Sequence, residues 1–231
     1  MKDWKFSKGK YYVTYCSTKS QILDIQKLRF QTYREEFDTD FFDISGTDKD
    51  KYDDLYDHLI VINNNTGDIV GTYRITVTDD NSYFGKNFDL GENSKELIEN
   101  SVEVGRLAIH KDHRNGVVMF LLFRGIGQYW VSNNKKYLMG AGSIPITSNH
   151  NYESYEKICS KVFNDIANSD TKKMDDEKIE ILPSIMRTYW KMGADLLNAP
   201  HFDPDFNCID YPVIMDIDKI EKKYAKFFLE E

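Results

Sequence analysis

The sequence predicts an α/β protein in which one mixed β-sheet is covered by helices on both faces. Segments rich in β-branched and aromatic residues alternate with segments of helical periodicity along the chain, which favours one layered sheet. No repeat, low-complexity tract or linker rich in Pro, Gly or Ser divides the sequence. A length of 231 residues fits one large domain, so we expect a single domain over residues 1–231.

The first half of the chain combines strand-like and helix-like patterns. Two of its strands are joined by NNNTGD, in which Gly67 can adopt the positive φ of a tight hairpin turn. Ser94 is expected to be the N-cap of a short helix. The expected elements are a strand at Tyr11–Ser17, a helix at Lys19–Phe37, strands at His58–Asn63 and Ile69–Val77, and a short helix from Ser94 through Asn100.

The second half of the chain continues the alternation. Its most apolar helix directly follows a strand and a polar turn, which is the order of a β–α unit. The expected elements are a strand at Val102–Ile109, a helix at Gly116–Asn133, a strand at Tyr137–Ile144, helices at about 150–168 and 183–193, a strand at Ile209–Ile217 and a short basic helix near the end.

Most of the excess negative charge lies in one segment, Asp38–Asp57, which holds eight acids and two lysines. A solvated loop is the favoured interpretation, and a metal site is the alternative. The spacing of an EF-hand is absent, because no Gly stands where the sharp turn of such a loop needs one. We therefore expect no metal here.

Charge and composition limit the function further. The chain has 30 basic and 38 acidic residues, a net charge of −8, which argues against a protein that coats nucleic acid. Cys16, Cys159 and Cys208 have no CxxC spacing, which favours a reducing compartment and argues against a disulfide framework. The first residues hold no apolar stretch typical of a signal peptide, and the longest apolar run, Val117–Phe123, is far shorter than the roughly 20 residues of a membrane span. We expect a cytoplasmic protein.

Two features could carry chemistry. Arg114 and Gly116 lie in the turn before the apolar helix, whose free backbone N–H groups would suit a phosphate. Glu103 and Arg106 are three positions apart on the preceding strand, so they point to opposite faces unless a β-bulge intervenes. An ordinary β–α turn and a pair of surface charges are the alternatives.

Several segments together resemble one branch of the GNAT superfamily, the bacterial ornithine-lipid N-acyltransferases. The likeness runs from about residue 12 to residue 218. A fainter likeness to acyl-homoserine lactone synthases rests on Arg29, Asp53, Arg74, Glu103 and Arg106. The segments are LRFQTYREEF (28–37), YDDLYDHLIVI (52–62), GTYRITV (71–77), VEVGRLAIHKDHRNG (102–116), LMGAGSIP (138–145) and LPSIMRTYWKMGADLLNAPHFDPDFNCIDYPVIMDID (182–218).

The resemblance implies a GNAT-like sheet and transfer of a long-chain fatty acyl group, with or without a 3-hydroxyl, to the α-amine of an amino acid such as ornithine. Glycine, lysine or glutamine would leave the same motifs. Glu103 is the expected general base, with Arg106 as the second catalytic residue. The other implied site residues are Arg29, Asp53, Arg74 and Ser143 for the substrate, and Ile109, Arg114, Gly116 and Val117 for the phosphopantetheine of the donor.

Alternatives remain for these assignments. Glu103 could instead pair with Arg106, and any of the arginines could pair with Asp53 or Asp57 rather than hold a substrate carboxylate. Tyr189 stands near the usual leaving-group acid of the superfamily, and its helix could equally bury it.

The implied donor is acyl carrier protein rather than acyl-CoA, with no tightly bound cofactor. The phosphate loop of the superfamily ends in Gly or Ala, where this chain has Val118. A carrier protein has a single phosphodiester and needs less of that loop. Carrier protein is acidic, so basic residues should dock it. The candidates are Lys111, Arg114, Arg124, Lys135 and Lys136.

The acyl chain is expected between Val117–Phe123 and the strand Tyr137–Ile144, because Gly140, Ala141 and Gly142 leave room there. Close packing of the helix is the equal alternative. The basic C-terminal helix could lie on an anionic membrane, although packing on its own domain is favoured. Rival functions are an acyl-homoserine lactone synthase, a CoA-dependent small-molecule acetyltransferase and a non-catalytic acyl-binding module.

Overall fold

The structure is a computed structural model that describes residues 4–37, 45–145, 184–197 and 199–228. The helix expected at about 150–168, Cys159 and the first residues of the acidic segment lie outside these ranges. The elements are β1 (Lys5–Lys8), β2 (Tyr11–Tyr15), α1 (Lys19–Phe37), β3 (Asp57–Asn63), β4 (Ile69–Val77), α2 (Tyr83–Asn87), α3 (Ser94–Glu99), β5 (Ser101–Ile109), α4 (Val117–Ser132), β6 (Tyr137–Pro145), α7 (Ser184–Lys191), β7 (Asp195–Leu196), β8 (His201–Asp203), β9 (Cys208–Asp216) and α8 (Lys222–Phe228).

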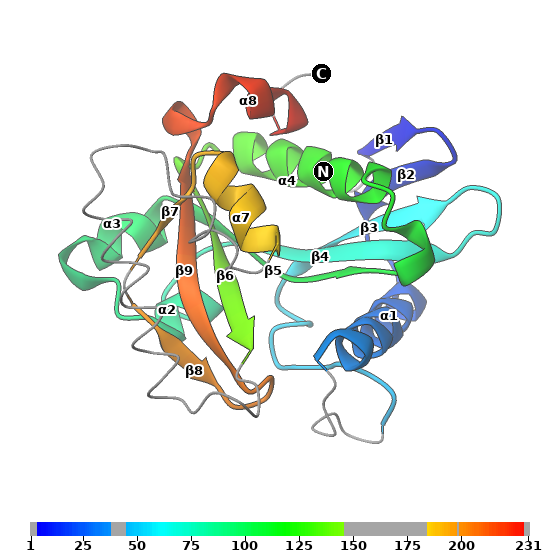
Figure 1. The fold of residues 1–231 in the computed structure, drawn as a ribbon, viewed down its shortest axis with the longest axis horizontal. Helices are drawn as coiled ribbons and strands as arrows, with labels where there is room; N and C mark the ends of the chain where they lie inside the picture. The colour runs from blue at the N-terminus through cyan, green and yellow to red at the C-terminus, as the bar shows by residue number, and fades with distance from the viewer. Residues whose placement is uncertain (1–3, 38–44, 146–183, 198, 229–231) are drawn as a thin grey trace.

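The described strands form one mixed sheet, as expected. Its order is β1-β2-β3-β4-β5-β6-β9-β7, and β8 also pairs with β9. The strands from β1 to β5 form an antiparallel meander, whereas β5 and β6 run parallel. A parallel pair requires a crossover, and α4 provides it (Figure 1). The single-domain organisation of residues 1–231 stays a prediction.

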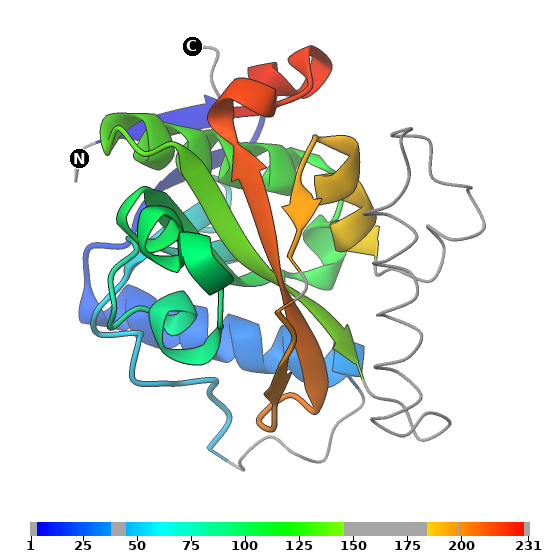
Figure 2. The same cartoon turned by 90° about the vertical axis from the view of Figure 1, so that its left-hand side faces the viewer.

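The two faces of the sheet are buried by different helices, which confirms the layered architecture (Figures 1 and 2). Leu59 and Val61 of β3 pack in the core beneath α4, and Ile60 and Ile62 pack with residues of α1 on the opposite face. This alternation follows from the two-residue period of a strand. All four side chains are buried, so the strand reads as a continuous apolar run.

The sheet opens between β5 and β6. Their parallel pairing covers only Ser101–Val104 with Tyr137–Gly140, although both strands continue well past this point. Beyond Val104 and Gly140 the two strands are therefore separated, and Figure 1 shows them diverging. A crevice beside the ends of paired strands is a common place for a ligand in an α/β sheet.

Several sequence-based expectations need correction. Ser94 is not an N-cap, because its backbone is helical (φ −52°) and a 3₁₀ turn at Gly91–Asn93 leads directly into α3. The short elements β1, α2, β7 and β8 were not expected, since two to five residues show no clear periodicity.

The wall expected for the acyl chain is also different. α4 packs on β1 to β5, with Val118 against Gly71 and Gly125 against Leu59. Gly142 of β6 is instead covered by α7, because a Cβ there would approach the Cε of Met186 to 2.6 Å. The small residue thus permits close packing of a helix, but of α7 rather than α4.

Candidate active site

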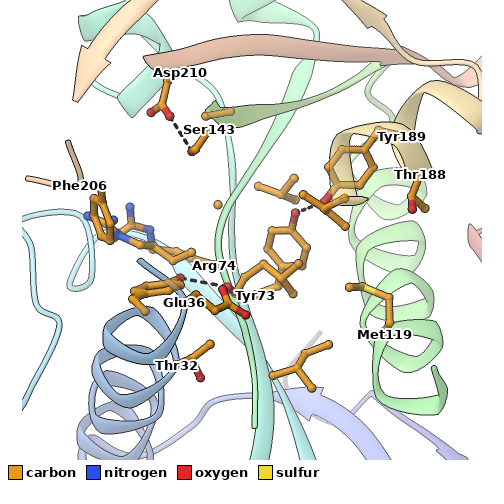
Figure 3. Close-up of a pocket in the computed structure, with 18 of the residues that line it drawn as sticks. Thr32, Glu36, Tyr73, Arg74, Met119, Ser143, Thr188, Tyr189, Phe206 and Asp210 are labelled. Carbon is orange, nitrogen blue, oxygen red and sulfur yellow. Dashed lines mark hydrogen bonds between the residues drawn. The ribbon is translucent and has the colours of Figure 1, made fainter. Parts of the chain in front are cut away.

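A cavity of about 660 Å³ lies at the opening between β5 and β6 (Figure 3). Ligand pockets typically have this size. Its walls come from both faces of the sheet, with α1, α2 and β9 on one side and α4 and α7 on the other. Of the site residues expected from the sequence, it brings together Arg74, Glu103, Arg106, Ile109, Arg114, Gly116 and Ser143, whereas Arg29, Asp53 and Val117 lie outside its lining.

A β-bulge places Glu103 and Arg106 on the same face of β5. The register between β4 and β5 shifts between Thr72 and Arg74, so two residues of β5, Arg106 and Leu107, lie opposite the single residue Tyr73 of β4. Arg106 has a left-handed backbone (φ 55°), which is uncommon for a residue other than Gly. With a spacing of three, the two residues share a face of the strand only if a β-bulge lies between them. The structure contains this bulge, which turns the Arg106 side chain toward the face of Glu103.

Glu103 is buried at the base of the cavity, with 3% of its surface exposed. Its Oε1 accepts a hydrogen bond from the Tyr56 hydroxyl (3.1 Å), and its Oε2 accepts one from the backbone N–H of Phe84 (3.1 Å). Burial raises the pKa of Glu103 to about 7, although these two donors and Arg74 lower it. A carboxyl group with this pKa can take up a proton at neutral pH.

Arg29 does not line the cavity, and its side chain is bound to acidic residues. Its guanidinium is fully buried, forms two hydrogen bonds to Asp53 (2.9 and 2.6 Å) and contacts Asp48 (2.8 Å). Gln26 donates a further hydrogen bond to Asp53 (3.0 Å). Burial would raise the pKa of Asp53, but the Arg29 guanidinium holds it well below its usual range. Both residues therefore support the site from behind.

Arg74 and Arg106 extend this network to the cavity. Arg74 donates to Asp50 (2.6 Å) and Asp53 (3.0 Å), and Arg106 donates to the other oxygen of Asp50 (3.0 Å). Burial opposes ionisation of Asp50, but these two guanidinium groups keep its pKa lowered. Arg106 also lies over the ring of Phe206 at 4.4 Å and keeps 17% of its side chain exposed. It is therefore the arginine of this network most open to a ligand.

The solvated-loop interpretation of Asp38–Asp57 is wrong for Asp48 and Asp53, whereas Asp54 and Asp57 are exposed. Asp48 and Asp53 are buried, and they are neutralised by arginines from α1, β4 and β5. A buried carboxylate needs such partners because desolvation is costly. The partners lie 19 or more positions away in the sequence, so local composition could not reveal them.

The far wall of the cavity joins the expected residue Ser143 to polar groups that the sequence did not single out. The Ser143 hydroxyl donates to Asp210 of β9 (2.6 Å), and the Tyr83 hydroxyl donates to its other oxygen (2.9 Å; Figure 3 shows the Ser143 bond). The side-chain atoms of Asp203, Cys208 and Asp210 that could bind a metal ion lie within 4.8 Å of one another. Burial and Asp210 raise the pKa of Asp203. In the sequence, Asp210 stands out only as the acid of the apolar segment FNCIDY. Its position beside Ser143 depends on the pairing of β6 with β9, which the sequence does not show.

At the opposite end, the cavity reaches the N-terminus of α4. Gly116 caps this helix with a left-handed backbone (φ 81°), and Asn115 accepts a hydrogen bond from the N–H of Val117 (3.1 Å). Arg114 spans the turn, since its Nε donates to the carbonyl of Ile109 (3.0 Å). The N-cap and first turn of a helix offer N–H groups that suit a phosphate.

Val118 does not obstruct this turn. Its side chain is fully buried and packs against Gly71 in the sheet. The steric basis for preferring a carrier protein over CoA is therefore absent at this position.

Two tyrosines meet beside the opening. The hydroxyls of Tyr73 on β4 and Tyr189 on α7 are 2.6 Å apart, and both residues line the cavity (Figure 3). Burial raises the pKa of Tyr189 well above its usual value, so its proton stays in place at neutral pH. Of the two interpretations of Tyr189, the structure favours a residue that faces the cavity.

Comparison with known proteins identifies the fold and the class of enzyme. The family model of an acetyltransferase (GNAT) domain matches residues 28–124. L-ornithine N(alpha)-acyltransferase of Rhodobacter capsulatus is 22% identical, over 94% of each protein. The acyl-homoserine lactone (AHL) synthase LasI aligns with a TM-score of 0.52 at 15% identity, over 95% of this chain and 94% of LasI. FeeM, an N-acyl amino acid synthase from uncultured soil microbes, aligns with a TM-score of 0.55 at 11% identity, over 91% and 94%. The chain is a GNAT-fold acyltransferase.

The basic residues of the acyltransferase are not arranged as one docking patch in the way expected. Lys111 and Arg114 pair with Glu35 (3.1 Å) and Glu36 (2.7 Å) of α1. Lys135 and Lys136 follow the C-terminus of α4, a helix of 16 residues and thus about 24 Å long. They are therefore far from the turn at Gly116 and cannot form one patch with it.

The terminal helix of the acyltransferase packs on its own domain, as favoured from the sequence. Phe228 is buried and contacts Phe123 and Trp130 of α4. Gly127 allows this approach, because a Cβ there would meet the Phe228 backbone. Among the described helices, no segment has the length and apolar character needed to cross a membrane.

Proposed function

We propose that this enzyme transfers a long-chain fatty acyl group from acyl carrier protein to the α-amine of an amino acid such as ornithine, as the first step of aminolipid synthesis. The observation that carries the proposal is the position of Glu103. Its carboxyl group faces a cavity that opens to the N-terminus of α4 on one side and to the Ser143 and Asp210 wall on the other. The Rhodobacter capsulatus relative, an L-ornithine N(alpha)-acyltransferase, supports the amino acid substrate.

The chemistry is a direct transfer between two bound substrates. Glu103 takes a proton from the amine, whose nitrogen attacks the thioester carbonyl, so that a C–N bond forms and the C–S bond breaks. Backbone amides of β5 beyond Val104, where β6 no longer pairs, stabilise the oxyanion. Tyr189 donates a proton to the departing thiolate.

The substrate's charged groups suit the two walls. Arg106, the more exposed guanidinium, binds the α-carboxylate together with Arg74. Arg29 and Asp53 hold Arg74 in place instead of contacting the substrate. Ser143 and Asp210 receive the polar end of the side chain, which in ornithine is an ammonium group.

Carrier protein docks beside the first turn of α4. The Lys8 ammonium lies 3.8 Å from the ring centre of Phe120, whose N–H bonds to the carbonyl of Gly116. Arg124 lies over Phe6 at 4.9 Å, and Lys10 lies over Tyr11 at 5.3 Å. These exposed or partly exposed cations lie beside the turn before α4 and along its first half, and they complement an acidic partner.

The test compares donors and amines with purified enzyme. Palmitoyl carrier protein, palmitoyl-CoA and acetyl-CoA are each offered with ornithine, lysine, glutamine, glycine or S-adenosylmethionine, and the products are identified by mass spectrometry. We expect N-acyl-ornithine from the carrier protein. Formation of an acyl-homoserine lactone, or transfer from acetyl-CoA alone, would support a rival function. Absence of turnover with every donor would support the non-catalytic acyl-binding module.

A second measurement uses lipids from a bacterium that expresses the chain. Appearance of an N-acylated amino acid in the lipid extract, and its loss in a Glu103→Gln strain, identifies the amino acid and the acyl length used in the cell. An unchanged lipid profile in a strain with verified expression would contradict a role in aminolipid synthesis.

A further inference from the structure

Both oxygens of Glu103 are held by one structural unit that the mechanism above does not use. Oε2 accepts the N–H of Phe84 in the first turn of α2, and Oε1 accepts the hydroxyl of Tyr56. The same Tyr56 oxygen accepts the backbone N–H of Tyr83 (2.7 Å). Tyr56 therefore connects the start of α2 to the carboxylate of Glu103. A hydrogen bond to each of its two oxygens fixes the orientation of this carboxylate.

We propose that Tyr56 is a positioning residue, which fixes the orientation and proton affinity of Glu103 by linking its carboxylate to the first turn of α2. The inference rests on the proposed role of Glu103 as the general base. Tyr56 acts through Glu103 and is absent from the cavity lining, so it is not itself a catalytic residue.

The ring of Tyr56 is in contact with two neighbouring groups, which restrict the position of its hydroxyl. The Tyr52 ring lies at 5.4 Å, and the Arg74 guanidinium lies over the ring at 5.2 Å. Arg74 is itself held by Asp50 and Asp53. The orientation of Tyr56 is thus coupled to the ion-pair network, and the network contributes to the site even where it does not contact substrate.

α2 also connects the base to the far wall. The backbone N–H of Tyr83 bonds to Tyr56, and the side-chain hydroxyl of the same residue donates to Asp210 on β9. Tyr83 therefore bridges the opening of the sheet, because Glu103 lies on β5 and Asp210 lies two strands away. This bridge keeps the base at a constant distance from the wall proposed to bind the substrate's side chain.

The charged and polar groups around Glu103 define the expected effect of Tyr56. They are Arg74 from β4, the Phe84 N–H and the Ser82 hydroxyl from the start of α2, and Tyr56 before β3. Burial raises the pKa of Glu103, and every one of these groups lowers it. Removal of the Tyr56 hydroxyl takes away a donor to the ionised form, so the pKa of Glu103 must rise further.

The experiment titrates the carboxyl group directly. Protein labelled with ¹³C at glutamate carboxyls is followed by NMR from pH 4 to 10, and the Glu103 signal is assigned by its loss in Glu103→Gln. We expect Tyr56→Phe to raise the pKa of Glu103 by about one pH unit. The rate at pH 7 should fall about fivefold and recover toward pH 9.5, because the ionised fraction recovers.

Tyr129→Phe is the matched control. Tyr129 is a buried tyrosine whose hydroxyl, like that of Tyr56, donates to a carboxylate, here Asp57 (3.2 Å), but on the α4 side of the sheet. It should lower the melting temperature without moving the Glu103 titration or the pH–rate profile. An equal, pH-independent loss of rate in both variants would show that Tyr56 contributes only to folding.

A second variant keeps the proposal testable if Tyr56→Phe folds poorly. 3-Fluorotyrosine at position 56 is nearly isosteric and has a more acidic hydroxyl, so it should lower the pKa of Glu103. An unmoved Glu103 titration with fluorotyrosine would overturn the inference. The titration needs no substrate, so an enzyme that transfers no acyl group would contradict the proposed function and leave this test intact.

Discussion

Glu103 and Arg106 lie on the same face of β5, although three positions separate them, because Arg106 has a left-handed backbone at a β-bulge. Without the extra residue, Arg106 would point toward α4 and away from Asp50. A non-glycine residue at positive φ costs stability, typically on the order of 1 kcal/mol or more. The ion pair with Asp50 holds Arg106 in this conformation, and the bulge lies where the pairing of β5 with β6 ends.

Replacement of the base should remove activity with little change in the fold. Glu103→Gln keeps the shape of the side chain but removes the proton acceptor, so we expect acyl transfer to slow by roughly 10²-fold or more. The rate is measured at saturating amine from pH 7 to 9. Circular dichroism and the melting temperature serve as the control for folding. A rate equal to that of the wild type across this range would assign Glu103 a structural role.

The same substitution should change how stability depends on pH. An unfolded Glu titrates at about 4.3, whereas burial raises the pKa of Glu103 to about 7 in the folded protein. The folded state therefore holds the proton between these values, and this stabilisation is lost as the pH rises through them. Relative to Glu103→Gln, the wild type should lose on the order of 3 kcal/mol between pH 4 and 8. Denaturant unfolding at several pH values measures this, and parallel curves would contradict it.

The elements of the fold were largely predictable, whereas the site was predictable only in part. In long segments such as Lys19–Phe37 and Val117–Ser132, the apolar residues that are buried recur at helical spacing. The sequence alone therefore predicted these two helices. Glu103 and Arg106 were noted from their spacing on a strand, but only the resemblance gave them a catalytic role. Tyr56, Tyr83 and Asp210 were missed, because their roles depend on α2 and β9 meeting across the sheet.

The ion-pair network should be essential to stability. Asp53 receives hydrogen bonds from Arg29, Arg74 and Gln26. Asp53→Asn would leave the fully buried Arg29 without its main counter-charge, so we expect a loss of about 3–5 kcal/mol in the free energy of unfolding. Asp54→Asn is the control, because Asp54 is exposed. Similar urea midpoints for the two variants would show that the network carries little stability.

Donor docking should depend on the β1–β2 hairpin and the first half of α4. Lys8→Glu together with Arg124→Glu should raise the KM for acyl carrier protein at least several-fold and weaken its salt dependence. The KM for acyl-pantetheine, which lacks the protein, should not change. Lys19→Glu with Lys27→Glu introduces the same charge on α1, on the other face of the sheet, and should leave both constants unaltered. Equal effects of the two pairs would indicate a general electrostatic influence instead of a docking surface.

The contribution of Tyr189 to the rate of acyl transfer should be larger when the thiolate is a poorer leaving group. Its hydroxyl bonds to that of Tyr73 at 2.6 Å, and burial keeps its pKa well above the usual value, so it holds a proton that it can donate. A pantetheine thiolate is a strong base that needs this proton, whereas an aromatic thiolate does not. Tyr189→Phe should therefore slow transfer from acyl-pantetheine by about 10²-fold, but transfer from an acyl nitrothiophenol ester much less. Tyr73→Phe, which keeps the Tyr189 hydroxyl, should show a smaller loss with the same leaving-group dependence. Equal losses with both donors in Tyr189→Phe would show that this tyrosine shapes the cavity and does not protonate the thiolate.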